Sequence, residues 1–156
     1  MNTLFLTHSI CFGQFHGYHN ITSPFGERIS PITKKTSFHS GIDIGASQGS
    51  LLYSVSDGII SFIGFNGANG YSIHINSDNF TFIYGHVSPQ FLVSKGSQVS
   101  KRSNYSAKSV LNMLIKLQKI HIKILLGKST NGSTTGPHLH FSIKKDGKAV
   151  NPLTYF

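Results

Sequence analysis

The chain has 156 residues and a formal net charge of +9, from 14 lysine and arginine residues against 5 acidic ones. This length predicts one domain that can bury a core, and the basic balance suggests an anionic partner. Five carboxylates are few for a glycosidase-type pair, and the single cysteine excludes an intramolecular disulfide or a cysteine-rich zinc module. No stretch approaches the roughly 18 consecutive apolar residues of a membrane span, and residues 1–17 do not resemble a signal peptide.

We predict that residues 1–22 form an N-terminal leader segment and that residues 23–156 form the domain. The leader contains His8, Cys11, His16 and His19. Their spacing matches no standard zinc module, so we do not expect a metal site there. Residues 23–28, S-P-F-G-E-R, form a turn-rich entry to the domain.

The first motif with chemical potential is H-S-G-I-D at residues 39–43. In an extended chain His39, Gly41 and Asp43 share one face, while the isoleucines beside Asp43 face the core. Gly41 leaves room for a group to approach the backbone, and a metal ion is a good candidate. The alternative is an ordinary strand with a surface histidine and a capping aspartate.

Two other short motifs resemble catalytic loops but lack their structural context. Residues 45–49 match G-x-S-x-G, yet a strand-like segment at 51–55 follows where a nucleophile elbow requires a helix. Residues 126–130, L-G-K-S-T, lack the first glycine of a phosphate-binding loop. We interpret both as loops without these functions.

The middle of the chain predicts several short strands, at residues 59–65, 71–75 and 80–86, separated by turn signals. Such spacing favours a mainly β, antiparallel fold. His86 ends the last of these strands, where it either reaches over a groove or is an ordinary polar residue at a strand end.

A different pattern follows, in which leucines and lysines recur at helical spacing on separate faces. It predicts one basic amphipathic helix near residues 106–123, with Ser106 as its N-cap. The helix either packs on the sheet with its lysines in water or binds an anionic surface.

The segment G-P-H-L-H-F-S-I at residues 136–143 alternates strictly. His138, His140 and Ser142 share one face of a strand, and the apolar residues between them share the other. We expect the apolar face to be buried and the two imidazoles to point outward, about 7 Å apart. They suit a metal ligand and an acid–base partner, although a polar edge strand with two histidines is the alternative.

Taken together, the motifs resemble the lysostaphin/LytM-type zinc metallopeptidases, which hydrolyse peptide bonds in bacterial cell-wall peptidoglycan. The resemblance runs from about residue 23 to the C-terminus. It rests on S-P-F-G-E-R at 23–28, F-H-S-G-I-D-I at 38–44, Y-G-H at 84–86, S-T-N-G-S-T-T-G-P-H-L-H-F at 129–141 and N-P-L at 151–153.

The resemblance implies an antiparallel β-sheet groove, one Zn²⁺ per chain and a substrate among the stem or cross-bridge peptides of peptidoglycan. It implies His39, Asp43 and His140 as zinc ligands and His138 and His86 as catalytic residues. His138 would take the proton of a zinc-activated water, and His86 would stabilise the oxyanion or protonate the leaving amine. Action at the cell wall is expected, whether extracellular, periplasmic or phage-associated.

The chain departs from the family pattern in an insertion at about residues 103–124, which includes the predicted helix. A strand beside residues 138–143 could be lost or altered there, and the basic helix could contact anionic wall polymers. All five polar positions are present, which favours an enzyme over a non-catalytic member that binds peptidoglycan or regulates another wall enzyme. Nucleic acid is not an expected partner, because the aromatic residues fall on apolar strand faces.

Overall fold

A computed structural model describes residues 21–46, 48, 51–91, 93–101, 124–125 and 136–155. The predicted helix near residues 106–123 and residues 1–20 of the predicted leader lie outside this part of the chain. None of the helices in the described ranges is both long and apolar enough to cross a membrane.

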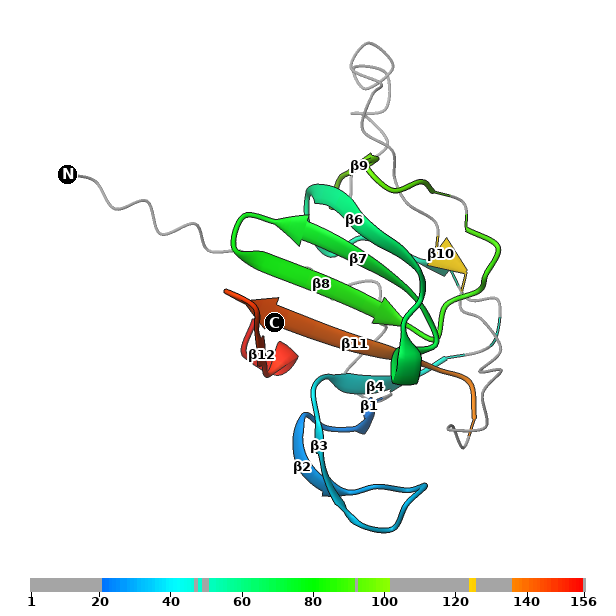
Figure 1. The fold of residues 1–156 in the computed structure, drawn as a ribbon, viewed down its shortest axis with the longest axis vertical. Coiled ribbons are helices and arrows are strands. Elements are labelled where there is room, and N and C mark those ends of the chain that lie inside the picture. The colour runs from blue at the N-terminus through cyan, green and yellow to red at the C-terminus, as the bar shows by residue number, and fades with distance from the viewer. Residues whose placement is uncertain are drawn as a thin grey trace, which may run out of the picture.

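The main element is an antiparallel sheet of eight strands, which confirms the predicted fold class (Figure 1). Its central strand is β11, which lies between β4 and β8 and also pairs with β12. In spatial order the strands are β1 (Ile21–Ser23), β4 (Ile42–Gly45), β11 (His138–Lys145), β8 (Phe80–Gly85), β7 (Tyr71–Ser77), β6 (Gly58–Phe65) and β9 (Gln98–Val99), with β12 (Lys148–Val150) on β11.

Smaller elements surround this sheet. A hairpin of β2 (Gly26–Ile29) and β3 (Thr36–His39) extends away from the sheet beside β4 (Figure 1). The predicted strand at residues 51–55 is shorter than expected: β5 (Leu51–Leu52) has two residues and, among the described strands, pairs only with β10 (Ile124–Leu125). Two 3₁₀ turns, η2 (Gly67–Asn69) and η4 (Pro152–Tyr155), complete the described elements.

Turn chemistry explains where the chain reverses. The β11–β12 hairpin turns at Asp146 and Gly147, which both have positive φ, as a two-residue turn of type I′ requires. Aspartate and glycine tolerate that conformation better than most residues.

One face of the sheet forms the hydrophobic core, as the alternation predicts. Leu139, Phe141 and Ile143 of β11 are completely buried, and Ile42 of β4 and Tyr84 of β8 pack with them. The buried Tyr84 hydroxyl accepts a hydrogen bond from the Val55 N–H and donates one to the Tyr53 carbonyl. These bonds tie the 53–55 segment to the core face of the sheet.

The opposite, polar face of β11 is buried at His140 and Ser142 and half-buried at His138, which corrects the expectation that both histidines point outward. His140 and Ser142 are only 5% and 3% exposed. The cause is a bend at residues 40–41, where β3 ends and β4 begins, so residues 39–43 are not one continuous strand as predicted. The backbone at Gly41 packs directly on β11 and covers this face.

Candidate metal centre

Strand pairing brings the predicted site residues to one place. On β11, His140 lies opposite Asp43 of β4 on one side and Gly85 of β8 on the other. His138 shares the face of His140 one pleat away, because side chains alternate along a strand. His39 ends β3, just before the bend at residues 40–41, and its ring lies beside that of His140. His86 directly follows β8.

Three ligand-type atoms converge at the centre. Asp43 Oδ1 lies 2.9 Å from His140 Nδ1 and 3.2 Å from His39 Nε2, and the two imidazole nitrogens are 3.0 Å apart. Neighbouring ligands on a tetrahedral Zn²⁺, at about 2.0–2.1 Å from the ion, are about 3.3 Å apart. The triangle therefore has nearly the dimensions of one face of a zinc tetrahedron, and the fourth position is left open.

Hydrogen bonds on the far side of each imidazole favour the ligand tautomers. His39 Nδ1 lies 2.7 Å from the Pro24 carbonyl, which can only accept, so Nδ1 carries the proton and Nε2 of the neutral ring carries a lone pair. His140 Nε2 lies 2.8 Å from Ser142 Oγ, which leaves Nδ1 for the centre. Three ligand-type atoms this close together could hold a metal ion, and this donor set suits Zn²⁺.

The carboxylate of Asp43 is ionised. Burial raises its pKa, but the side chains of His140 and His39 lower it more, and the pKa lies well below its ordinary value. A charged carboxylate ligand reduces the charge of a divalent cation without neutralising it completely.

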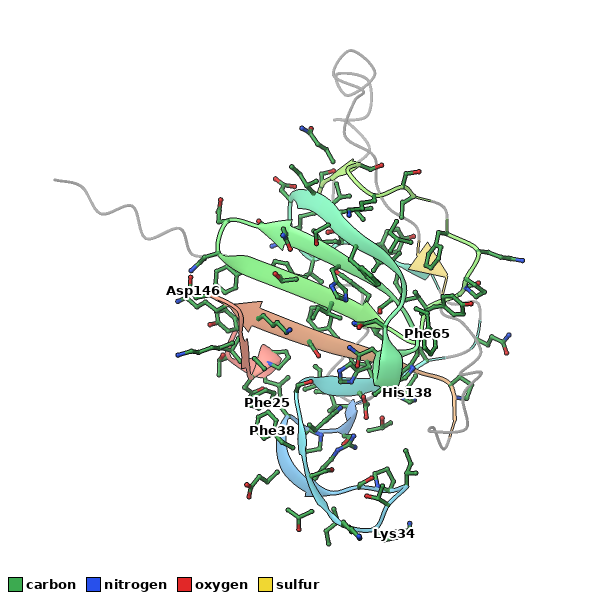
Figure 2. The ribbon with its side chains drawn as sticks, in the orientation of Figure 1. Phe25, Lys34, Phe38, Phe65, His138 and Asp146 are labelled. Carbon is green, nitrogen blue, oxygen red and sulfur yellow. The ribbon has the colours of Figure 1, made fainter. Side chains whose placement is uncertain are left out.

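Two further histidines flank the centre. The rings of His138 and His86 meet edge to face with centroids 4.8 Å apart, and the His86 ring is 6.2 Å from that of His140. His138 Nδ1 donates to the Gly136 carbonyl at 2.9 Å, so its Nε2 carries a lone pair 3.8 Å from Asp43 Oδ1. Figure 2 shows His138 beside the ends of β4 and β11.

His86 is held in an uncommon backbone conformation with φ of 59°. Its N–H donates to the Asn69 carbonyl at 2.9 Å, so the η2 turn fixes this residue. Burial, together with the positive charge that His138 can carry, lowers the pKa of His86 to about 4. The ring is therefore neutral at physiological pH and keeps one N–H that can donate a hydrogen bond.

Gly41 provides a test of the bend that places His39 over β11. A Cβ at this position would lie 2.5 Å from the Phe141 carbonyl oxygen and 3.0 Å from the His140 ring. We expect Gly41→Ala to destabilise the metal-free protein by about 1–3 kcal/mol, because an added methyl group there overpacks a buried contact. Thermal unfolding in the presence of a chelator measures this effect.

The matched control for that substitution is Gly136→Ala, where a Cβ would meet nothing within 4 Å. The control should unfold within about 0.5 kcal/mol of the unchanged protein, as most exposed substitutions do. Equal stability of the two variants would mean that β11 and the bend are not in the close contact described.

The structure thus brings together all five residues that the sequence predicts, His39, Asp43, His86, His138 and His140; their individual roles stay predictions. It also adds groups that sequence reasoning did not assign: the Pro24 carbonyl, the Ser142 hydroxyl and Arg28. Two of these groups, the Pro24 carbonyl and Arg28, belong to the S-P-F-G-E-R motif, but only the fold brings them to the site.

Comparison with known proteins identifies the family of this chain. The sequence pattern of peptidase family M23 matches residues 37–104, which include His39, Asp43 and His86. The DD-carboxypeptidase/endopeptidase Mpg of Neisseria meningitidis is 31% identical over 138 residues, which cover 88% of this chain. The chain carries an M23 peptidase domain of the lysostaphin/LytM type.

Other relatives of this M23 domain extend the comparison. Peptidoglycan DD-endopeptidase ShyA of Vibrio cholerae is 27% identical over 128 residues, covering 81% of the chain and 25% of ShyA. Mpg is also much longer, and the chain spans 27% of its length. The chain therefore corresponds to about a quarter of each of these two proteins.

Solved structures share the fold. Helicobacter pylori Csd3 is 32% identical, with a TM-score of 0.61 over 90% of this chain and 33% of Csd3. A zinc-containing peptidase from Vibrio cholerae is 25% identical, with a TM-score of 0.60 over 84% of this chain and 35% of its own. The catalytic domain of lysostaphin from Staphylococcus simulans, at 20% identity, shows the same fold with a TM-score of 0.60, over 85% and 87% of the two chains.

Proposed function

We propose that this chain is a zinc-dependent endopeptidase that hydrolyses peptide bonds in bacterial cell-wall peptidoglycan. The observation that carries the proposal is the triangle of His39, Asp43 and His140, flanked by two histidines that do not belong to it. The names of Mpg and ShyA support the reaction class, and that of ShyA supports the substrate.

In this proposal one Zn²⁺ is held by His39 Nε2, Asp43 Oδ1 and His140 Nδ1. When bound, it supplies Lewis-acid polarisation of the scissile carbonyl and lowers the pKa of a coordinated water. The Pro24 carbonyl holds His39 in its ligating tautomer, and the Ser142 hydroxyl can accept from His140 Nε2 in the tautomer that frees Nδ1. The protein's own side chains then have to move protons and stabilise developing charge.

We assign these tasks to His138 and His86. The lone pair on His138 Nε2 faces the centre, so this residue accepts the proton of the attacking water as a general base. The neutral His86 ring donates its N–H to the developing oxyanion, and the positive φ of its backbone fixes the direction of that donor. No glutamate base is needed.

We further propose that the peptidase domain spans residues 23–156, with an insertion at about 103–124. The M23 match ends at residue 104, which supports the start of the proposed insertion near residue 103. The paired strand β1 begins at Ile21, so the sheet includes the last residues of the predicted leader. A location at the cell wall, where peptidoglycan is found, follows from the proposed substrate.

The test combines metal content with cleavage. We expect the purified chain to contain about one zinc per molecule, and we expect it to clear a suspension of purified peptidoglycan and release new amino groups. A chelator should stop both the clearing and the amine release, and added Zn²⁺ should restore them. Sedimentation with peptidoglycan without amine release would instead indicate a non-catalytic binding protein, and no zinc binding at all would overturn the proposal.

A further inference from the structure

The two carboxylate oxygens of Asp43 have different surroundings. Oδ1 faces the imidazoles of His39 and His140, whereas Oδ2 points the other way and lies 3.5 Å from Arg28 Nη1. The side chains of Asp43 and Arg28 are 12% and 25% exposed, so solvent screens this ion pair only in part. One oxygen is thus left for a metal ion and the other is held by the protein.

Arg28 is itself held in place. Its Nη1 also donates to Ser23 Oγ, and Ser23 lies on β1 directly opposite Asp43 in the strand register. The Nε atom of Arg28 is buried and makes no hydrogen bond to any described residue. Among the described residues, Ser23 and Asp43 are therefore the groups that orient the guanidinium.

The same short segment also holds His39. The Pro24 carbonyl accepts from His39 Nδ1, and the Phe25 ring packs edge to face against Phe38, with centroids 5.1 Å apart (Figure 2). Gly26 has a φ of 113°, a conformation that side chains other than glycine rarely adopt, and a Cβ there would meet nothing within 4 Å. The glycine therefore serves the turn that sends Pro24 toward His39 and Arg28 toward Asp43.

We propose that residues 23–28 form the outer shell of the metal centre, with Arg28 as the positioning residue that makes Asp43 a ligand through Oδ1 alone. The proposal rests on the zinc site described under Proposed function. With Oδ2 paired to Arg28, the carboxylate cannot rotate to present both oxygens to the ion. Outer-shell groups of this kind typically change metal affinity by about 10–100-fold when they are removed.

The experiment compares Arg28→Met with Lys35→Met in the full chain. Each substitution removes one positive charge from the β2–β3 hairpin, but Lys35 is an exposed residue beside the hairpin tip marked by Lys34 in Figure 2. Competition with a chromophoric chelator gives the zinc dissociation constant. We expect zinc affinity to fall about 10–100-fold in Arg28→Met and to change less than threefold in Lys35→Met.

A second readout reports the coordination itself. The visible absorption of bound Co²⁺ is strong for four ligands and weak for five or six, so a carboxylate that binds through both oxygens weakens it. We expect this loss of intensity in Arg28→Met and not in Lys35→Met, with partial recovery in Arg28→Lys. Thermal unfolding without metal verifies that each variant is folded.

The outcomes separate this inference from the proposed function. If the unchanged chain binds zinc and Arg28→Met binds it equally well with the same cobalt spectrum, the role of Arg28 is wrong and the zinc site stands. If the unchanged chain binds neither metal, both proposals fail. Equal losses in Arg28→Met and Lys35→Met would point to general electrostatics and would also overturn the positioning role.

Discussion

Alanine at His140 is expected to lower the zinc affinity of the protein by about 10²-fold or more. His140 lies between β4 and β8 and contributes Nδ1 to the triangle with His39 Nε2 and Asp43 Oδ1. Zinc sites built from four protein ligands are worth about 10–16 kcal/mol, or roughly 3 kcal/mol for each ligand. Two remaining ligands should not retain the ion through purification, and metal analysis of the purified variant measures its loss.

His140 is 5% exposed, so its removal could also disturb the fold. Asp43→Asn is the second variant, because it keeps the size of the side chain while removing the charge of the ligand. His74→Ala is the matched control: His74 lies on β7, two strands from β11, and packs against Phe62 outside the centre. We expect zinc loss in the first two variants and full zinc in the third. Full zinc occupancy in a folded His140→Ala protein would show that the ligand set is wrong.

Much of this site was predictable from local pattern alone. Alternation along residues 42–44 and 138–143 identified the buried apolar faces correctly, and it placed Asp43, His138 and His140 on the opposite faces. Strand periodicity records which side of a sheet a residue takes. The resemblance to the lysostaphin/LytM type then linked motifs that lie far apart in the chain, including His140 and Asp43, which are 97 residues apart.

The remainder depends on tertiary contacts that have no local signature. The bend at Gly41 is specified by the β11 backbone, about 100 residues further along the chain, so a continuous strand at 39–43 was the natural but wrong prediction. The Pro24 carbonyl that orients His39 is a backbone atom that every residue possesses. The ion pair between Arg28 and Asp43 exists only because β1 and the β2–β3 hairpin meet β4 at that point.

Removal of the flanking histidines is expected to have the opposite signature from removal of a ligand. We expect His138→Ala and His86→Asn to keep their zinc but to lose about 10²–10⁴-fold in kcat/KM for peptidoglycan peptides, the usual contribution of a general acid–base group. The rings of both residues lie beside the triangle without belonging to it. Asparagine is chosen at His86 because it tolerates the positive φ of 59° better than alanine does.

The measurement pairs zinc content with initial rates on a soluble cross-bridge peptide, which removes any effect of binding to the intact wall. His74→Ala again serves as the control, with normal zinc and normal rates expected. The two substitutions should also be far from additive, since the proton taken by His138 and the charge stabilised by His86 belong to the same step of the reaction. Near-normal hydrolysis by either zinc-loaded variant would remove that residue from the mechanism, whereas loss of zinc in His138→Ala would move it into the ligand set.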